Sequence, residues 1–523
     1  MRTTCVRGAI AKVGAEVSLT ACHSVDVLIV GGGINGAGIA RDAAGRGLDV
    51  ALVEQADLAS ATSSSSTKLI HGGLRYLEFM EFGLVRQALI ERERLLGIAP
   101  HLIRPMQFIL PHVPGLRPRW LIRLGLFIYD HVGGRRSLPS SHAVRLDALG
   151  EPVLRSHLRH GFSYSDCRVD DSRLVICNAL DAMERGASIL THTRLVSAQS
   201  RDGLWHARCE DGDGRKHELR ARALVNAAGP WVERVRALLP VERGTSHLRL
   251  VKGSHIVVPR LFEGTHAFML QNADGRIVFT IPYEHDWTLV GTTDVRFEGN
   301  PAAVHITPEE TGYLCDTVNR YFRRAIGPGD VRWSYAGVRP LLDDESPDAS
   351  RVTRDYRLEL TDGARHPPLL TIYGGKITTY RRLAEAALEM LRPHVGGARH
   401  GWTDRATLPG GDLPRADFEA FLQDVRRRWP FLGERLSLRL AHAYGTRIER
   451  ILGTASAMDD LGEHYGAGLT AAELDYLRSR EWARDPDDVL WRRTKLGLHL
   501  SEREQARVAA AMGADTEVAL KTS

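Results

Sequence analysis

The sequence predicts an α/β protein with a Rossmann-type nucleotide-binding domain, an antiparallel-sheet substrate domain and an all-α C-terminal cap domain. Three observations support this prediction. A strand, glycine-turn, helix and strand pattern occupies residues 25–54, short strands of mixed polarity fill the middle of the chain, and helical periodicity dominates after about residue 393.

The composition is that of an ordinary globular protein. Of 523 residues, 43% are hydrophobic and 25% are charged, which argues against wholesale disorder and a polytopic membrane protein. The net charge of +5 comes from 69 basic and 64 acidic residues, dispersed along the chain without a nucleic-acid recognition motif. We therefore expect no nucleic-acid partner. No apolar run reaches the ~18 residues that a membrane-spanning helix needs.

The six cysteines form no CxxC pair and no regular framework. This pattern fits reduced thiols in a cytosolic protein. No cluster of metal ligands is evident in the sequence, so we predict no metal site.

Residues 1–24 precede the first predicted strand and indicate a loose N-terminal extension. They contain basic residues but lack the apolar core and small-residue cleavage site of a secretory signal. A transit peptide and a misread start remain open alternatives for this stretch.

The first element is a βαβ unit. A β-branched run from Val25 predicts a buried parallel strand, a helix follows over 37–46, and a second strand over 49–54 ends on Glu54. Between the first strand and the helix lies the motif GGGING at 31–36. This order of strand, glycines, helix, strand and acid is far more specific than a lone glycine motif.

Each residue of this motif has a physical role in binding a dinucleotide. Gly31 permits the tight turn, Gly33 lets the backbone approach a pyrophosphate, and Gly36 lets the helix pack closely on the strand. The helix N-terminus offers free N–H groups to phosphate. Glu54 lies where its carboxylate can accept hydrogen bonds from ribose hydroxyls, and its charge disfavours an NADP-type ligand.

The next segment is rich in small hydroxyl residues. The run ASATSSSST at 59–67 has the composition of a flexible linker, but it leads directly into KLIHGGLRY at 68–76. Its hydroxyls could instead hydrogen-bond a cofactor. Both interpretations stay open from the sequence.

Two later segments resemble further ligand-binding turns. The strand at 221–228 ends on small residues and Gly229, and the strand at 369–373 ends on paired glycines before Lys376 opens a helix. Two helix N-termini far apart in the sequence suggest a long ligand held at both ends. FAD fits that demand better than NAD, with its pyrophosphate at the first helix and its flavin edge at the second.

These elements divide the chain into three predicted parts. Residues 1–24 form the extension, residues 25–392 form an FAD-binding domain interleaved with a substrate domain, and residues 393–523 form the helical C-terminal domain. The substrate domain is expected mainly at 77–220 and 240–365, where patterns such as RIVFTI indicate antiparallel strands.

Long motifs in this order resemble the aerobic, FAD-dependent glycerol-3-phosphate dehydrogenase family, whose fold is similar to that of the D-amino-acid oxidases. The resemblance runs from about residue 26 to beyond residue 510. The motifs include GGGINGAGIARDAAGRG (31–47), STKLIHGGLRYLE (66–78), FSYSDCRVDDSRL (162–174), LVNAAGPWV (224–232), LVKGSHIVVP (250–259), VGTTDV (290–295), AGVRPLLDDES (336–346), YGGKITTYRRLAE (373–385) and DDVLWRRTKLGL (487–498).

The resemblance implies oxidation of sn-glycerol 3-phosphate to dihydroxyacetone phosphate. A hydride from C2 would reach flavin N5 of a non-covalent FAD, and electrons would pass to a membrane quinone. The enzyme would then lie in the cytoplasm, peripherally attached to the inner face of the cytoplasmic membrane; a homodimer is left open. Two alternatives stay open as well: an oxidase that uses O₂, and a non-catalytic flavin-binding redox sensor.

Five residues are predicted to bind substrate and carry the chemistry. Arg75 and Arg339 match substrate-facing arginines of the family, and a guanidinium suits a phosphate. Lys376 and Tyr76 are further candidates beside the flavin. A neutral histidine suits proton abstraction from the C2 hydroxyl near pH 7, so His255 is the predicted general base, with a structural core histidine as the alternative.

The predicted cofactor residues gather in the same motifs as the turns described above. They are Gly31, Gly33, Gly36, Glu54, Thr62, Ser63, Ser66, Lys68, His71, Gly73, Gly229 and Gly375.

Two basic segments are candidates for contact with an anionic membrane. Residues 116–136 mix arginine with large apolar residues, a composition suited to a lipid interface, although a basic helix that covers the core would look the same. The segment WRRTK at 491–495 is a weaker candidate.

Overall fold

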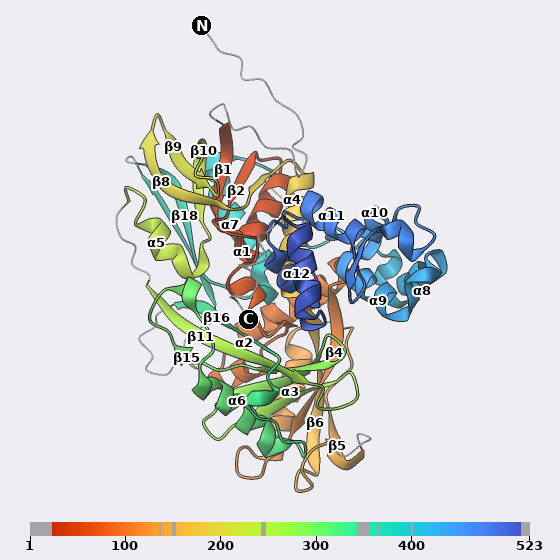
Figure 1. Cartoon of the computed structure of the whole chain (residues 1–523). Coiled ribbons are helices and arrows are strands. Elements are labelled where there is room, and N and C mark those ends of the chain that lie inside the picture. Colours follow the sequence, from red (N-terminus) through yellow and green to blue (C-terminus); the bar gives the residue numbers. More distant parts are fainter. Residues whose placement is uncertain are drawn as a thin grey trace.

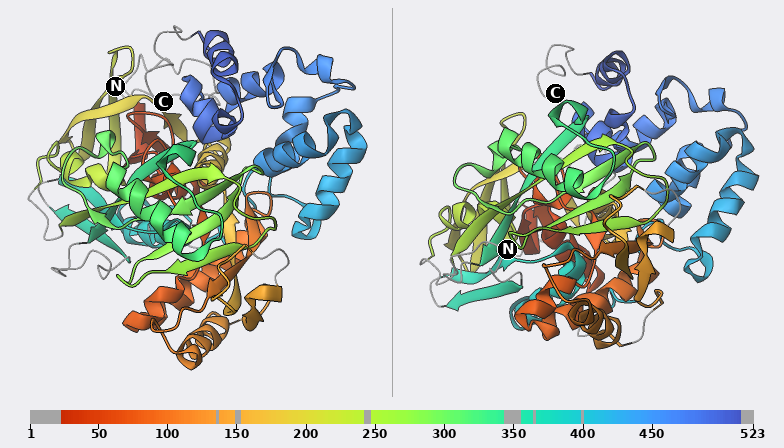
Figure 2. Two further views of the ribbon diagram at one scale, coloured as in Figure 1. Left: turned by 60° about the horizontal axis from the view of Figure 1, so that its bottom comes forward. Right: turned by 90° about the horizontal axis from the view of Figure 1, so that it is seen from below.

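The computed structural model describes residues 23–134, 137–148, 153–241, 247–342, 355–363, 366–398 and 401–513. Two sheets lie one above the other in Figure 1, and the C-terminal helices (blue) stand beside them; Figure 2 shows the same arrangement from two other sides. The predicted N-terminal extension lies outside the described residues, except for its last two positions.

The first sheet has eight strands around a parallel centre. Its order is β17-β18-β10-β1-β2-β7, and β8 and β9 extend it antiparallel from β10. β1 pairs in parallel with β2 and β10, as the βαβ prediction requires. The strands are β1 (His23–Val30), β2 (Val50–Val53), β7 (Ser188–Leu190), β8 (Thr193–Arg201), β9 (Leu204–Asp211), β10 (Lys216–Asn226), β17 (Tyr356–Gly363) and β18 (His366–Gly374).

Alternation along β1 explains why this sheet is covered on both faces. Val27 and Ile29 pack into the core formed with the helices α1 (Ile34–Gly45), α4 (Asp171–Glu184) and α7 (Tyr380–Val395). Leu28 and Val30 point to the opposite face, where Trp205 contributes to a second core. Successive side chains of a strand point to opposite faces of the sheet, and apolar side chains on both faces are typical of a buried parallel strand.

The second sheet has ten strands and is mostly antiparallel. Its order is β15-β11-β14-β13-β12-β4-β6-β3, with β16 on β11 and β5 on β6; only the β12–β4 pair among these is parallel. The strands are β3 (Leu69–Ile70), β4 (Ile103–Pro111), β5 (His142–Arg145), β6 (His160–Val169), β11 (Leu248–Pro259), β12 (Ala267–Gln271), β13 (Ile277–Tyr283), β14 (Trp287–Gly291), β15 (Val295–Arg296) and β16 (Trp333–Leu342).

Three helices accompany this second sheet. α2 (Phe82–Ile98) and α3 (Arg119–Val132) pack on its β4–β6 side, where Leu89 and Tyr129 join a core with Tyr164. α6 (Pro308–Tyr321) starts with a capping box between Thr307 and Glu310 and packs near β11 to β13. This sheet therefore has its own core, separate from that of the first sheet.

The C-terminal part is helical, as expected. Its core gathers large side chains such as Trp429, Tyr444 and Leu477. One departure from the all-α prediction is a two-stranded hairpin of β19 (His464–Gly466) and β20 (Leu469–Thr470). The helices are α8 (Phe418–Arg428), α9 (Gly433–Tyr444), α10 (Glu449–Leu452), α11 (Ala471–Arg480) and α12 (Glu502–Ala511).

The predicted fold class is confirmed, but one predicted range is too broad. The substrate domain is predicted mainly at 77–220 and 240–365, whereas β7 to β9 and the first part of β10, which fall within 77–220, belong to the first sheet. Their alternating pattern is that of a half-buried antiparallel strand, which does not tell which sheet the strand joins.

Four cysteines, at 167, 177, 209 and 315, are buried and unpaired within the described chain. No described helix is long and apolar enough to cross a membrane.

The turn from β1 into α1 allows no side chain at two glycines. Gly31 has φ +115°, and a Cβ there would lie 2.5 Å from the carbonyl oxygen of Ala227 on the neighbouring strand end. A Cβ at Gly36 would lie only 1.9 Å from the carbonyl oxygen of Gly31. The helix therefore starts in direct contact with the turn backbone.

We expect Gly36→Ala to lower the free energy of unfolding by about 2 kcal/mol or more, because the methyl group must push α1 away from the turn. Gly312→Ala is the matched control. Gly312 lies within α6, and a Cβ added there would meet no atom within 4 Å, so alanine should stabilise the helix by up to ~1 kcal/mol. Denaturant unfolding of the two variants measures the difference; equal stability would contradict the close-approach argument.

Candidate active site

A cavity of about 230 Å³ lies at the carboxyl ends of the parallel strands. The β1–α1 turn, the end of β2, the loop 59–63, the turn after β10 and the glycines after β18 line it. Gly31, Gly33, Gly229 and Gly375 are among the lining residues, so four predicted cofactor glycines from three distant motifs meet here.

The hydroxyl-rich loop is joined to the start of α1. Ser63 Oγ accepts a hydrogen bond from the backbone N–H of Ile34 (3.0 Å), and Thr62 Oγ1 donates to the carbonyl oxygen of Val338 (2.6 Å). Both residues line the cavity. The position of this loop favours the cofactor-loop interpretation over a linker.

Glu54 lies at the end of β2 and lines the same cavity. Its carboxylate accepts hydrogen bonds from the backbone N–H groups of Gly32 (2.6 Å) and Ala56 (2.9 Å). Burial raises the pKa of this carboxyl, while the two N–H groups lower it. The acid is thus held beside the glycine turn, on the side of the cavity expected to hold a ribose.

The residues of the cavity fit a dinucleotide. The first turn of α1 carries no acidic side chain that would repel a phosphate, and a Cβ at Gly33 would approach Ser63 Oγ to 3.1 Å. Asn35 adds a buried side-chain oxygen that has no hydrogen-bond partner among the described residues. An unmatched polar atom beside a helix N-terminus is what a polar ligand would satisfy.

Ser66 and Lys68, also predicted to bind cofactor, point elsewhere. Ser66 Oγ donates to Asp171 Oδ2 (2.7 Å), and Lys68 Nζ donates to Asp171 Oδ1 (2.8 Å). Neither residue lines the cavity described above. The sequence could not show this, because their partner lies more than 100 positions away.

His71 and Gly73 lie further along the same loop. The backbone of His71 exchanges hydrogen bonds with the hydroxyl of Thr378, just ahead of α7. Gly73 has φ +79°, and a Cβ there would lie 2.1 Å from the ring of Tyr76. The glycine therefore leaves room for a predicted substrate residue.

His255, on β11, is fully buried. Its Nε2 lies 3.0 Å from Thr67 Oγ1, its Nδ1 has no hydrogen-bond partner in the described part of the chain, and its ring stacks on Tyr335 at 4.7 Å. Burial, and then the positive charges of Arg339 and Lys68, hold the pKa of His255 well below its usual range. The imidazole is therefore neutral at physiological pH, as a general base must be.

Arg339, on β16, is held from two sides. Its guanidinium forms an ion pair with Asp294 and donates a hydrogen bond to Thr292 Oγ1 (3.0 Å). A quarter of the side chain remains exposed. The guanidinium is thus oriented before any ligand binds.

Two of the other three predicted substrate residues, Lys376 and Tyr76, are in contact, and Arg75 lies in the same loop as Tyr76. Lys376 Nζ lies 3.8 Å from the centre of the Tyr76 ring, and Arg75 lies over Phe79 with its Nε buried and unpartnered among the described residues. The structure thus brings Lys376 and Tyr76 together, and separately His255 and Arg339. Thr67 and Tyr76, from one loop, belong to different groups.

Several site residues were missed from the sequence. Asp294 stands in the VGTTDV motif and could have been proposed as a partner of an arginine, but no local signal selects that arginine. Asn35 lies between the motif glycines. Further cavity residues that no motif marked are Thr193, Arg194 and Arg234.

Comparison with known proteins identifies the family of this chain. The family model for FAD dependent oxidoreductases matches residues 26–381, and a model for the C-terminal domain of alpha-glycerophosphate oxidase matches residues 402–518. A glycerol-3-phosphate dehydrogenase of Pseudomonas aeruginosa is 54% identical over 92% of this chain and 94% of its own length. A D-erythritol 1-phosphate dehydrogenase of Brucella abortus is 49% identical over 92% and 97%.

A solved structure has the same fold. The glycerol-3-phosphate dehydrogenase of Bacillus halodurans, complexed with FAD, matches with a TM-score of 0.72 at 28% identity and covers 94% of this chain and 95% of its own. The resemblance and the FAD cofactor predicted from the motifs are thereby confirmed. The chain belongs to the FAD dependent oxidoreductase family, in the branch of the glycerol-3-phosphate dehydrogenases.

Proposed function

We propose that this chain oxidises sn-glycerol 3-phosphate to dihydroxyacetone phosphate and passes the electrons to a membrane quinone. The observation that carries the proposal is the pairing of a buried, neutral histidine with an oriented arginine on adjacent strands of the second sheet. The substrate needs both a proton acceptor for its C2 hydroxyl and a cation for its phosphate.

Arg339 and Arg75 bind the phosphate in this proposal. Asp294 and Thr292 fix the guanidinium of Arg339, so little side-chain freedom is lost when an anion binds. Arg75 has a buried N–H without a partner among the described residues, which an anionic oxygen would satisfy.

His255 takes the proton of the C2 hydroxyl. The free site holds its pKa low through burial and two nearby cations. A bound phosphate dianion beside Arg339 offsets one of these charges and raises the pKa of His255, so the base strengthens when substrate is present. Bound FAD would accept the two electrons of the C2–H bond.

Lys376 holds a substrate oxygen or a negative charge beside the cofactor. It follows Gly375, which lines the cavity, and its ammonium lies on the ring of Tyr76. The ring holds the lysine by a cation–π contact without neutralising it.

D-Erythritol 1-phosphate is a second candidate substrate, because a relative named for it is 49% identical. Both molecules combine a phosphate with a secondary alcohol, and the residues that bind those groups do not distinguish them. Anaerobic addition of each compound to the holoenzyme tests the choice. We expect glycerol 3-phosphate to bleach the flavin absorbance at lower concentration; the reverse order would assign the chain to the longer substrate.

The same experiment distinguishes an enzyme from a redox sensor, since a protein that binds glycerol 3-phosphate without oxidising it leaves the flavin oxidised. The electron acceptor is tested by steady-state turnover. We expect a soluble quinone to raise the rate. Peroxide formed in proportion to substrate, with no gain from quinone, would instead identify an oxidase.

We expect Arg339→Ala to raise KM for glycerol 3-phosphate about 30-fold or more, because a charge-assisted contact to phosphate is worth about 2 kcal/mol. Arg296→Ala is the control, since this exposed arginine lies on β15 of the same sheet and pairs only with Glu298 within the described chain. An unchanged KM in Arg339→Ala would refute the phosphate assignment.

The helix α3 supports attachment to a membrane surface. Its buried side holds Ile122, Leu126 and Tyr129, while Trp120 (68% exposed) and Phe127 (52%) face outward. The adjacent segment adds exposed Phe79 and Met80. Leu121 and Leu124 extend this apolar surface, and Arg119 and Arg123 lie exposed within it.

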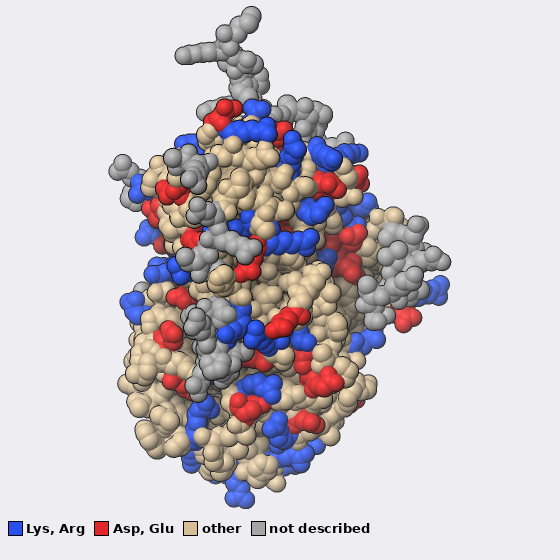
Figure 3. All heavy atoms as spheres, turned by 90° about the vertical axis from the view of Figure 1, so that its left-hand side faces the viewer, with Lys and Arg blue, Asp and Glu red and all other residues tan. Residues whose placement is uncertain are grey.

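A quinone is confined to lipid, so an enzyme that reduces it must reach the bilayer without spanning it. We place this α3 surface on the inner face of the cytoplasmic membrane. On the face drawn in Figure 3, basic and acidic side chains are interspersed rather than gathered by sign.

We expect the double variant Trp120→Glu/Phe127→Glu to lower binding to anionic vesicles at least tenfold. Burying each aromatic ring in lipid contributes about 2 kcal/mol to the free energy of binding, and the variant loses this contribution. Ala420→Glu/Gln423→Glu on α8 adds the same charge at exposed sites of the C-terminal domain. Flotation with vesicles measures both. Charge reversal at Arg119 and Arg123 should weaken binding to anionic but not neutral vesicles; flotation unchanged by all these variants would remove α3 as the contact.

A further inference from the structure

Most of the C-terminal motif at 487–498 lies inside the molecule rather than on its surface. Its WRRTK segment was a candidate for membrane contact, but Arg493 is 1% exposed and Lys495 is 3% exposed. The expectation is therefore wrong. The reason is that Arg493 pairs with Asp57 and Lys495 pairs with Asp170, in other parts of the chain, which a local composition cannot reveal.

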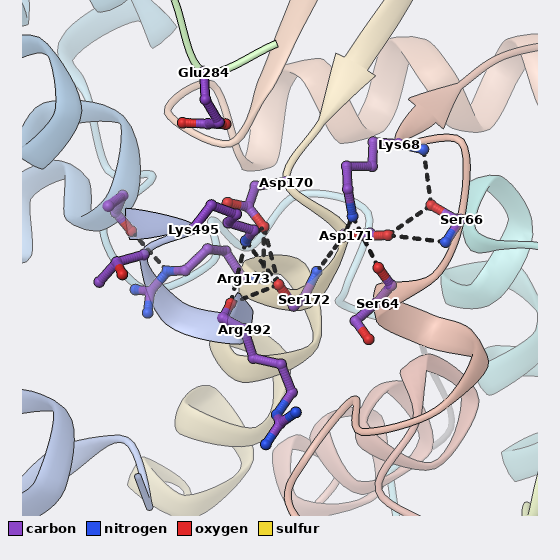
Figure 4. A network of polar contacts seen from close by, with 12 residues as sticks. Ser64, Ser66, Lys68, Asp170, Asp171, Ser172, Arg173, Glu284, Arg492 and Lys495 are labelled. Atoms are coloured by element: carbon purple, nitrogen blue, oxygen red, sulfur yellow. Dashed lines mark hydrogen bonds and ion pairs between the residues drawn. The ribbon is translucent and has the colours of Figure 1, made fainter. Parts of the chain in front are cut away.

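A polar route leads from this motif to the cofactor loop (Figure 4). Lys495 Nζ forms an ion pair with Asp170, the N-cap residue of α4, and donates a hydrogen bond to Ser172 Oγ (2.8 Å). The next residue, Asp171, pairs with Lys68 Nζ at 2.8 Å. Two adjacent acids at one helix start thus connect the C-terminal domain to the loop.

An aromatic route leads from the same motif to the second sheet. Trp491 stacks on Trp333 with ring centres 4.6 Å apart, and Trp333 contacts Tyr335 at 5.0 Å. Tyr335 in turn stacks on His255 at 4.7 Å. The four rings form a continuous contact from the C-terminal domain to the proposed base.

The two routes meet at Tyr335. Lys68 Nζ lies 5.2 Å from the centre of its ring, and its hydroxyl donates to the carbonyl oxygen of Ser66 (2.9 Å). Thr67, between those two loop residues, contacts His255 Nε2. The face and the edge of the base are therefore both fixed by groups that the C-terminal motif supports.

We propose that Trp491 and Lys495 are positioning residues for His255. Together they hold Tyr335 and the loop 66–68 against the imidazole, so that the base stays desolvated and its Nε2 keeps one direction. This inference rests on the proposed function, because it assigns His255 the role of base. Neither residue contacts the substrate groups described above.

The expected effect on pH dependence follows from the groups that face His255. These are Arg339 and Tyr335 on β16 and Lys68 on the loop; the facing position on β14 is Gly291. If the packing loosens, water reaches the ring and its pKa rises toward the usual value. Since a general base must be neutral, kcat/KM then begins to fall at a higher pH.

The test compares pH profiles of the holoenzyme. In Trp491→Leu and Lys495→Met, we expect the acidic limb of kcat/KM to move up by about one pH unit, a tenfold loss on the limb, with KM at high pH little changed. Lys495→Arg keeps the cation and should restore the wild-type limb. Trp491→Phe keeps a stacked ring and provides a second variant where the leucine disturbs folding.

Arg492→Met is the matched control. Arg492 anchors the same segment by pairing with Asp57 (2.6 Å) and Asp488, but its side chain does not lead to Tyr335. A limb that moves equally in this variant would mean general loosening and overturn the proposal. An acidic limb of kcat/KM that stays at the wild-type pH in the Trp491 and Lys495 variants would also overturn the proposal.

Failure of this inference is distinguishable from failure of the proposed function. His255→Asn should abolish the acidic limb, and wild-type flavin should be reduced by glycerol 3-phosphate without air. If both results are obtained but the Trp491 and Lys495 variants have the wild-type pH profile, only the positioning role is wrong. If wild-type flavin is not reduced, the proposed function is wrong. If His255→Asn keeps the acidic limb, the assignment of His255 as the base is wrong.

Discussion

Two neighbouring carboxylates at the start of α4 link the cofactor loop to the C-terminal domain. Asp171 is fully buried and pairs with Lys68 of the cofactor loop, and Asp170 pairs with Lys495 of the C-terminal domain. Burial alone would raise the pKa of Asp170, yet Lys495 lowers it below its usual value. A buried acid that loses its cation costs several kcal/mol, so each pairing fixes the segment that supplies the cation.

In the proposed active site, carboxylates position the cations beside the histidine. Arg339 and Lys68 both lower the pKa of His255; Arg339 pairs with Asp294 and Lys68 pairs with Asp171. A doubly negative substrate beside Arg339 would add negative charge close to the imidazole. In the proposed reaction this makes substrate binding and activation of the base one electrostatic event.

How much could be predicted from the sequence depended on how far apart along the chain the interacting residues lie. The βαβ unit was predictable because Gly36 packs on the Gly31 backbone and Glu54 accepts from the Gly32 N–H, both within one supersecondary unit. The burial of Lys495 was not, since Asp170 lies 325 positions away. Assignment of β7 to β9 failed for a related reason: alternation gives the faces of a strand but not the sheet that it joins.

The same limit applies to reading basic residues as a surface. Arg123 and Lys495 both lie in segments that mix cations with large apolar side chains, and composition alone made each a membrane candidate. The structure separates them by what the cation contacts. Arg123 is exposed on a helix whose tryptophan and phenylalanine point outward, whereas Lys495 is buried against Asp170 and the nearby Trp491 stacks inward on Trp333. A segment that mixes cations with tryptophan therefore predicts a contact surface. Whether that surface contacts lipid or another part of the protein depends on where the acidic partners of its cations lie.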